Sequence, residues 1–234
     1  MAAIGRQIDL SVAIRSAALV LAFALAQSPV HAVGGHHTVD DAAMIEPGVC
    51  EFEAWGERER GAARTLAHSG LGCRAGPVEL AIGADRTRVA GGPATTSLIP
   101  QLKWATAFAP RWSAGVIVWG TWQTGGDGGY RGSTLMLPVT WQAVDSVAVH
   151  LNAGRDFRRG EPHSSRSGVA VEWMPAAAWS AVAERYRESG ANFWRAGGRW
   201  SPTPELSVDI SRAAGMSGAP APWWTLGMKL AFGQ

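Results

Sequence analysis

The sequence is poor in long apolar runs, in cysteine and in net charge, and each shortage narrows the class of protein. Its apolar run "SAALVLAFALA" (16–26) is shorter than the ~20 residues that a transmembrane helix needs, and no later stretch reaches that length. Two cysteines, 23 residues apart, do not suggest a structural zinc site, which needs more cysteine or histidine ligands at close spacing. A net charge of +2 gives no reason to expect nucleic-acid binding. These shortages count against a helical membrane protein, a zinc-stabilised domain and a nucleic-acid-binding protein.

Glycine and tryptophan, by contrast, are abundant, with 29 and 12 residues against only two tyrosines. Several segments alternate strictly between apolar and small or polar residues, for example "PVELAIGADR" (77–86), "SVAVHLNAG" (146–154) and "PWWTLGMKLAFGQ" (222–234). Strands of about ten residues with one apolar face are typical of transmembrane β-barrels. The alternation therefore predicts an all-β protein whose strands have two differently solvated faces.

Twelve segments qualify as strands, although a ten-stranded barrel would also suit the pattern. The expected strands are 48–58, 63–73, 77–88, 97–109, 111–123, 130–142, 146–156, 167–174, 177–187, 191–201, 205–213 and 223–233. Odd-numbered links are mostly long and rich in glycine or charge, whereas even-numbered links are tight turns, as in outer-membrane barrels. Because an open sheet edge is too costly in lipid, we predict a closed antiparallel up-and-down transmembrane β-barrel, present as a monomer.

The N-terminus has the features of a secretory signal peptide. Arg6 and Arg15 precede the apolar run, and small residues at Val30 and Ala32 fit a cleavage site after Ala32. We therefore expect a signal peptide at 1–32, a periplasmic N-terminal tail at 33–47 and an outer-membrane barrel at 48–234. Small solutes, membrane lipid, lipopolysaccharide and the barrel assembly machinery are the expected partners.

Tryptophan placement favours the membrane barrel over a soluble β-sandwich or lipocalin-like barrel, which would show the same alternation. One group lies near the short turns and a second near the long links, as expected for aromatic belts at two headgroup levels. These groups are Trp112, Trp141, Trp173, Trp179 and Trp200, and Trp55, Trp122, Trp194 and Trp224.

The opening of the expected mature chain carries a family resemblance. The stretch "GGHHTVDDA…IEPGVCEFEAW" resembles the mature start of small proteobacterial outer-membrane proteins that are loosely grouped with transporters named after the MetA pathway of phenol degradation. The last strand is similar in plan to those of outer-membrane barrels, but Phe232 lies two residues before the end instead of at it. The resemblance implies a fold and a location, not a substrate.

Cys50 and Cys73 are expected to form a structural disulfide, because an even number of cysteines in an exported protein usually means a bridge. If the two residues pair across the first hairpin, its midpoint falls between Gly61 and Ala62, inside the link "RERGA". The bridge would then fix the register of the strand that closes the barrel.

The inward faces of the predicted strands carry charges of both signs. The expected lumen-lining residues are Glu51, Glu53, Glu79, Lys103, Arg195, Arg199 and Lys229. Closure would bring Lys229 and Arg199 toward Glu51 and Glu53. The pattern predicts a narrow channel or transporter that selects small solutes or ions by charge. The alternative is that these pairs fill the lumen of a plugged structural or adhesive barrel.

Other functions rest on weaker signals. Arg155, Arg158, Arg159 and Arg166 surround the fourth long link and could bind lipopolysaccharide phosphates or simply form a solvated loop. A barrel lipase or protease is less favoured, because no G-x-S-x-G motif accompanies the histidines and His163 has only sequence neighbours, Ser164 and Ser165, as partners. We expect no catalytic residues.

The segment "VGGHHTVDDA" (33–42) is the remaining signal, expected to lie in a free periplasmic tail that could also fold back under the barrel mouth. His36, His37, Asp40 and Asp41 are ligand types that suit copper or zinc. A metal site in the tail is one hypothesis. The alternative is a recognition or capping segment, with Asp40 or Asp41 at the start of a short helical turn.

Overall fold

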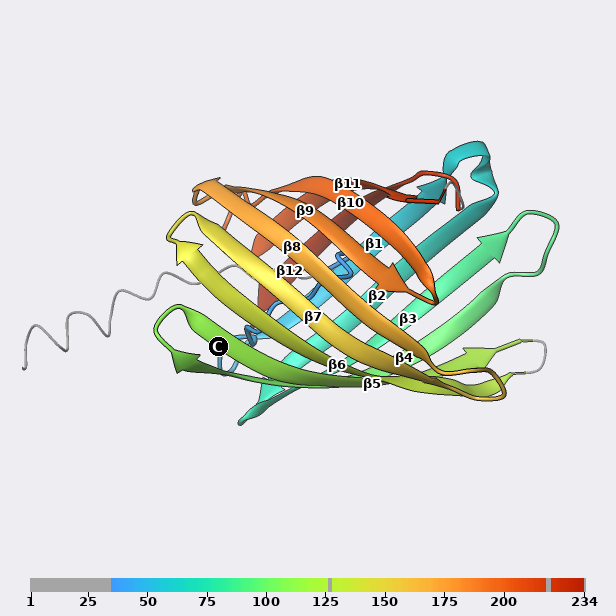
Figure 1. Ribbon diagram of the computed structural model, residues 1–234, viewed down its shortest axis with the longest axis horizontal. Helices are drawn as coiled ribbons and strands as arrows, with labels where there is room; N and C mark the ends of the chain where they lie inside the picture. Colours follow the sequence, from blue (N-terminus) through green and yellow to red (C-terminus); the bar gives the residue numbers. More distant parts are fainter. Residues whose placement is uncertain (1–34, 126–127, 218–219, 234) are drawn as a thin grey trace, which may run out of the picture. The chain divides into compact units, whose positions relative to one another are not determined.

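The computed structural model describes residues 35–125, 128–217 and 220–233, so the expected signal peptide lies outside the described residues. Twelve antiparallel strands close into a barrel in which β1 pairs with β12 (Figure 1). The strands are β1 (Cys50–Glu59), β2 (Arg64–Ala75), β3 (Val78–Val89), β4 (Thr95–Ala109), β5 (Trp112–Thr124), β6 (Gly129–Val144), β7 (Val147–Arg158), β8 (Ser164–Ala176), β9 (Trp179–Glu188), β10 (Ala191–Trp200), β11 (Leu206–Gly215) and β12 (Trp223–Phe232). A single 3-10 turn, η1 (Arg60–Ala62), joins β1 to β2. The prediction of a closed twelve-stranded barrel is confirmed.

Strand boundaries differ from the prediction mainly at the ends next to the long links. β8 begins at Ser164 instead of 167, and β7 continues to Arg158. The start of β8 is polar on both faces, so the apolar alternation on which the prediction depended is absent there. The end of β7 continues the alternation by one outward apolar residue, Phe157. As a result Arg158 and Arg166 belong to paired strands and not to a loop.

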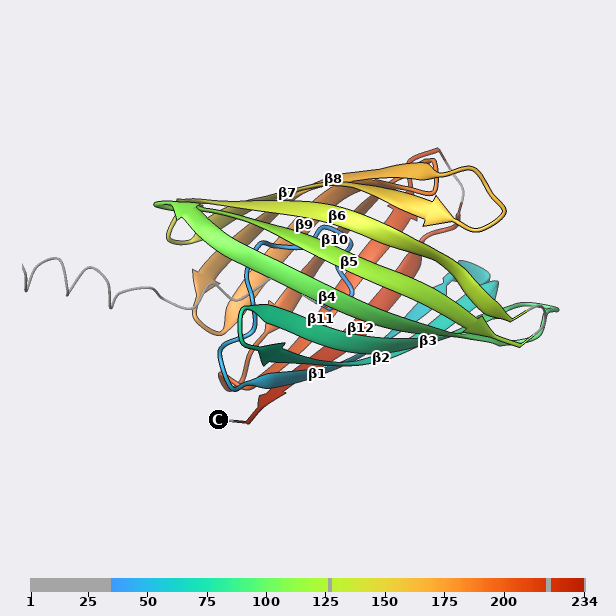
Figure 2. The ribbon, with the colours of Figure 1, turned by 90° about the horizontal axis from the view of Figure 1, so that it is seen from below.

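The two rims of the barrel differ broadly as the link lengths predict, with two exceptions: the odd-numbered link after β9 is only 189–190, and the even-numbered link after β10 is 201–205. The longer links after β1, β3, β5 and β7 gather at one rim, here called the loop end (Figures 1 and 2). The short turns and the C-terminus lie at the opposite rim, here called the turn end. In barrels of this kind long loops face the cell exterior and short turns face the periplasm.

Alternating burial gives the wall two distinct faces. Large apolar side chains point outward and are exposed, for example Ile82 (53%) and Leu226 (60%). Polar and charged side chains such as Asp156 and Glu172 point inward and are buried. Soluble proteins rarely expose so continuous an apolar surface, whereas lipid requires it. No helix among the described residues is long and apolar enough to cross a membrane.

Outward tryptophans lie near both rims, with one exception to the expected belts. At the turn end the Trp112 and Trp141 rings stack with centroids 5.6 Å apart across neighbouring strands. Trp55 instead faces the lumen, where its ring stacks on His68 at 3.5 Å. It shares the inward parity of Glu53 and Glu57, so its place in the outer belt was predicted wrongly.

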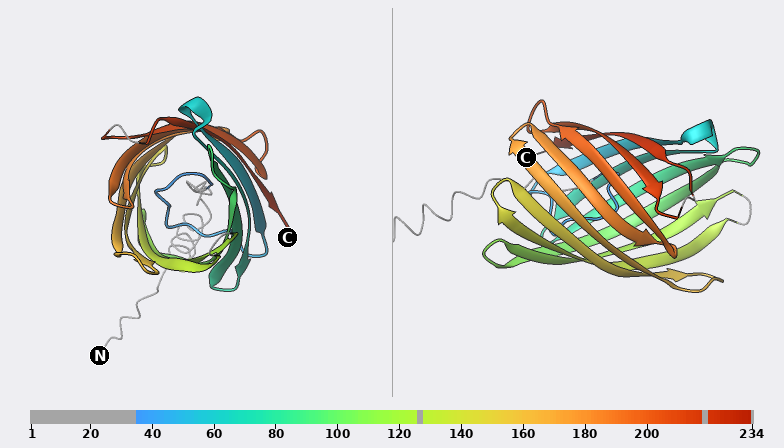
Figure 3. Two further views of the ribbon diagram at one scale, coloured as in Figure 1. Left: turned by 90° about the vertical axis from the view of Figure 1, so that its right-hand side faces the viewer. Right: turned by 45° about the horizontal axis from the view of Figure 1, so that its top comes forward.

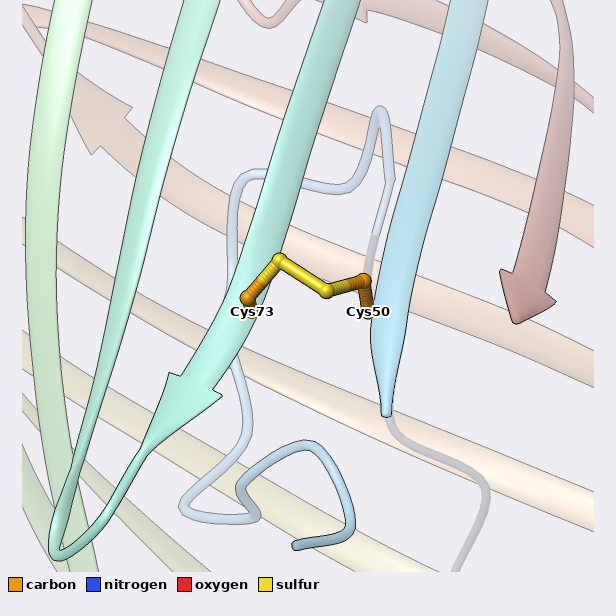
Figure 4. Close-up of a disulfide and its surroundings, with 2 residues drawn as sticks. All are labelled: Cys50 and Cys73. Atoms are coloured by element: carbon orange, nitrogen blue, oxygen red, sulfur yellow. A yellow bond between two sulfur atoms is a disulfide. The ribbon is translucent and has the colours of Figure 1, made fainter. Parts of the chain in front are cut away.

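The disulfide between Cys50 and Cys73 is present and joins β1 to β2 (Figure 4). The strands pair with Cys50 opposite Cys73 and Arg58 opposite Thr65, which is the predicted register. β1 is also the strand that meets β12. The bridge therefore fixes the strand on which barrel closure depends.

Replacing both cysteines by serine should lower the free energy of unfolding by about 3 kcal/mol, because the bridge restricts the unfolded chain between residues that are 23 apart. Urea unfolding of the barrel in lipid vesicles, followed by tryptophan fluorescence, measures this difference. The wild-type protein in reductant is the matched control and should behave like the double variant. Equal unfolding midpoints for oxidised wild type and variant would contradict the prediction.

Candidate functional site

Residues 35–47, here called the plug segment, lie inside the barrel. In the end-on view of Figure 3 this segment, drawn in blue, lies within the ring of strands. His36, Val39, Asp41, Ala42 and Ile45 are buried. We had expected a free tail that could fold back under the barrel mouth, and the segment instead lies within the barrel. Its partners come from strands far away in the chain, and sequence alone could not pair it with them.

Two lumen side chains hold the backbone at the centre of the plug segment. The Glu184 carboxylate on β9 accepts hydrogen bonds from the backbone N–H groups of Thr38 (3.2 Å) and Val39 (2.9 Å). The Asn152 side chain on β7 accepts from the N–H of Asp40 at 2.8 Å and donates to its carbonyl at 2.7 Å. A chain with no strand partner of its own thus has its buried polar groups satisfied by the wall.

Further contacts hold the C-terminal half of the plug segment. Thr140 on β6 accepts a hydrogen bond from the N–H of Ala42 at 2.9 Å, and Glu79 on β3 accepts from that of Ile45 at 3.1 Å. Arg74 on β2 donates to the Ile45 carbonyl at 3.2 Å. Together with Glu184 and Asn152, these residues anchor the segment to five strands around the lumen.

Lys103 on β4 makes the main charged contact with the plug segment. Its ammonium lies 3.0 Å from Asp40 Oδ1 and 3.3 Å from Asp41 Oδ1. Lys103 and Asp41 are buried, whereas the Asp40 side chain is partly exposed. Removing one partner of a buried pair leaves an uncompensated charge, so this contact is the most sensitive of the set.

Val39 is the apolar anchor of the plug segment. It is fully buried and packs with Ala170, Val182 and Tyr186 of β8 and β9. A β-carbon added at Gly168 would lie 2.5 Å from Val39 Cγ2, closer than any real contact. A glycine is therefore required where the plug segment touches β8.

The histidine pair faces separate carboxylates. His36 Nδ1 contacts Asp209 Oδ1 on β11, and His37 Nδ1 lies 3.6 Å from Glu184 Oε1. The two rings stack with centroids 4.5 Å apart. With Asp40 and Asp41 drawn to Lys103, the four proposed metal ligands do not converge, and the described residues contain no group of three or more ligand side chains placed to hold a metal.

Burial lowers the pKa of His36 to about 4, despite the opposing effect of the Asp209 carboxylate. Because the pKa of His36 is lower in the docked state than in a released segment, neutral His36 favours docking. This contribution is complete above the ordinary histidine pKa of ~6.5. That contribution, about 3 kcal/mol, is lost as the pH falls toward 4. Acidification should therefore loosen the plug segment.

Electron paramagnetic resonance of a nitroxide at Ala43 should show a growing mobile component between pH 6.5 and 4. The variant His36→Gln has no imidazole to protonate at position 36, so it should lack this pH-dependent rise in mobility. The comparison separates protonation of His36 from pH effects on its neighbours Asp209 and His37. Identical pH profiles for the two proteins would show that another group controls docking.

The predicted lumen residues form separate ion pairs instead of two opposed walls. Lys229 lies 3.1 Å from Glu51, as closure suggested. Arg199, however, contacts Asp209 at 3.8 Å on the neighbouring strand β11, not Glu51 or Glu53. The remaining pairs are Arg195 with Glu57 at 3.2 Å and with Glu184 at 3.5 Å, and His68 with Glu53 at 3.6 Å.

Sequence reasoning placed Glu79 in the lumen but missed the other acceptors that hold the plug segment. Glu184 and Asp209 point inward by the same period of two that placed the other lumen residues, so they could have been found in "AVAERYRE" and "LSVDISR". Asn152 and Thr140 carry no such signal, because uncharged polar residues are common on any lumen wall. Gly168 could be recognised only once Val39 was known to lie against it.

The arginines around the fourth long link do not form one loop cluster. Arg166 points inward and contacts Asp156 at 2.6 Å, and it also pairs with Glu188. Arg158 lies 3.3 Å from Glu161. Arg155 alone among the strand arginines of this hairpin points outward, and Arg159 is exposed in the link. These four arginines therefore do not present one common loop surface, and phosphate binding by them stays a prediction.

The closed barrel, its apolar exterior and its polar lumen define an outer-membrane β-barrel protein. The fold is shared with the KdgM porin solved in complex with disordered oligogalacturonate (TM-score 0.62, 8% identity, 78% of this chain and 99% of that chain). It is also shared with the NanC porin (TM-score 0.59, 9% identity, 76% of this chain and 98% of that chain). A third neighbour is the COG4313 outer membrane channel from Pseudomonas putida F1 (TM-score 0.58, 11% identity, 82% of this chain and 98% of that chain). These structural neighbours are channels or porins and not enzymes.

The sequence matches the family described as "Uncharacterised conserved protein UCP029691" over residues 20–232, and the chain belongs to that family. No curated protein matches the sequence.

Proposed function

We propose that this protein is a narrow outer-membrane channel for small solutes that the plug segment closes at rest. The observation that carries the proposal is the nature of the plug contacts. They are mainly hydrogen bonds and ion pairs to lumen side chains, with Val39 as the one fully buried apolar side chain among residues 35–47. Water entering the lumen can replace such contacts one for one, at a lower net cost than separating an apolar interface.

The names of the neighbouring structures support passage of solutes without identifying one. They include porins, an outer membrane channel and the Ralstonia pickettii toluene transporter TbuX, which shares 7% identity with this chain at a TM-score of 0.50. A lumen wall with paired charges of both signs favours small polar or zwitterionic solutes in this chain. We further propose export by a signal peptide at 1–32. Because β1 begins at the turn end, the plug segment then enters the lumen from the periplasmic side.

A permanently closed structural barrel is the second candidate. It is favoured by the buried pair of His150 and Glu172, which lie 3.6 Å apart. His150 is also hydrogen-bonded to Thr140, the residue that holds Ala42, so these side chains fill the lumen next to the plug segment. The two candidates differ in whether the plug segment must move, and one tethering experiment separates them.

A disulfide between Val39→Cys and Gly168→Cys would tether the plug segment to β8, since these positions are already in contact. In planar bilayers the oxidised double variant should be silent. Reductant should restore small conductance steps, at least as frequent as those of wild type, because the β-carbon added at Gly168 crowds the plug segment. Val39→Cys alone, with and without reductant, controls for loss of the native bridge. Equal conductance of the oxidised double variant and wild type would refute gating, and silence of every form, reduced included, would establish the closed barrel.

A further inference from the structure

The charged residues that point outward from the strands are all arginines. Seven of them lie near the loop end on β1, β3, β7, β9 and β11, and the exposed Arg131 lies at a register shift of β6. Among the outward-facing positions of the described strands there is no aspartate, glutamate or lysine. The seven near the loop end are Arg58, Arg86, Arg88, Arg155, Arg185, Arg187 and Arg212, and all seven are exposed. A charge of one sign on a lipid-facing surface is costly unless it meets an opposite charge in the membrane.

Three of these arginines fall in one row across five neighbouring strands. Arg88 on β3 is opposite Thr65 on β2, and Thr65 is opposite Arg58 on β1. On the other side Arg58 is opposite Trp224 on β12, which is opposite Arg212 on β11. Since paired strands lie ~4.8 Å apart, the arginines are spaced by about 10 Å.

The row has features of a binding surface beyond its charge. The Arg212 guanidinium lies over the Trp224 ring at 5.8 Å from its centroid, which directs it along the wall. Within residues 35–125, 128–217 and 220–233 none of the three arginines forms an ion pair with a carboxylate. Toward the turn end the next outward residues on β12 and β11 are Leu226 and Ile210, both apolar and exposed, whereas the next one on β3 is Arg86.

We propose that Arg58, Arg88 and Arg212 bind the phosphate groups of lipopolysaccharide in the outer leaflet. The loop end faces the cell exterior, where this lipid carries phosphates above its acyl chains. Guanidinium groups bind phosphate through paired, charge-assisted hydrogen bonds, and Arg suits this better than Lys. The apolar surface around Leu226 and Ile210 receives the acyl chains. This site is separate from the lumen and does not depend on the channel proposal.

The test is binding of lipopolysaccharide with a bis-phosphorylated lipid A to the purified full-length protein in detergent, measured by native mass spectrometry and by thermophoresis. The variant Arg58→Gln, Arg88→Gln, Arg212→Gln should bind at least about tenfold more weakly than wild type, with a smaller difference at high salt. A control variant removes three arginine charges away from the row, and it should keep wild-type affinity. Its substitutions are Arg155→Gln on β7, Arg159→Gln in the link that follows, and Arg111→Gln in the turn between β4 and β5, where Arg111 pairs with Asp145.

Unchanged affinity of the first variant, or an equal loss in both, would overturn the proposal. Dephosphorylated lipid A should bind wild type as weakly as the first variant does. Inorganic phosphate or phosphatidylglycerol that binds as tightly as lipopolysaccharide would show that a free anion or a phospholipid is the ligand instead. The heat-dependent gel shift of a folded barrel confirms that each variant has folded before binding is compared.

Discussion

Lys103→Glu should release the plug segment and turn a mostly closed barrel into a mostly open one. The substitution removes the cation beside Asp40 and Asp41 and places a third carboxylate there, with Glu79 also nearby. Breaking a buried pair costs about 3–5 kcal/mol, and repulsion adds to that cost. The open probability in planar bilayers should therefore rise by more than about a hundredfold.

Lys229→Glu is the matched control, because Lys229 also lines the lumen and pairs with Glu51 but has no contact with the plug segment. It should alter ion selectivity with little change in open probability. If both variants open equally, general lumen charge controls conductance and the specific anchoring by Lys103 is refuted. A nitroxide at Ala43 reports plug release independently of current.

Gly168→Ala should also open the channel, by a steric route that leaves every charge in place. The added carbon would lie 2.5 Å from Val39 Cγ2 and 3.2 Å from the Tyr186 β-carbon. Overpacking of this kind costs about 1–3 kcal/mol, and displacement of the plug segment relieves it more easily than movement of a paired strand. Open probability should rise by roughly tenfold or more.

A second substitution tests whether the clash with Val39 is the cause. Gly168→Ala combined with Val39→Ala removes the clashing methyl groups and should restore much of the closed state. Gly198→Ala is the control, because its nearest neighbour would be the Ser180 carbonyl at 3.6 Å, an ordinary contact. If the double variant stays as open as Gly168→Ala, the effect comes from strand β8 itself and not from the plug segment.

The barrel was predictable from sequence because its physics is local. A period of two, read against short and long links, gives strand number, closure and even the Cys50–Cys73 register, since each depends on residues close together in the chain. The ends of β8 were not predictable, because Ser164 and Arg166 lie beyond the apolar alternation. Arg166 also pairs with the inward carboxylate of Asp156, and no residue spacing in the sequence predicts that ion pair.

The plug segment was visible in the sequence but its role was not. The run from His36 to Asp41 stood out by composition, and a metal site was a reasonable hypothesis for such ligands. Its carboxylates are instead used against Lys103, which is 62 residues from Asp41 in the chain. A contact at that separation depends on the closed barrel, so the fold had to be known before the segment could be interpreted.

The disulfide-fixed start of β1 also determines how a released plug behaves. Gly48, with φ of +82°, lies between the plug segment and Cys50. A released plug segment therefore stays tethered to Cys50, whose position the disulfide fixes. Thirteen residues extend at most roughly 45 Å, which keeps the free segment near the barrel mouth. Its effective concentration there is then in the millimolar range, independent of how much protein the membrane holds. Block and unblock should therefore be rapid single-molecule events, and closure should need no second copy of the chain.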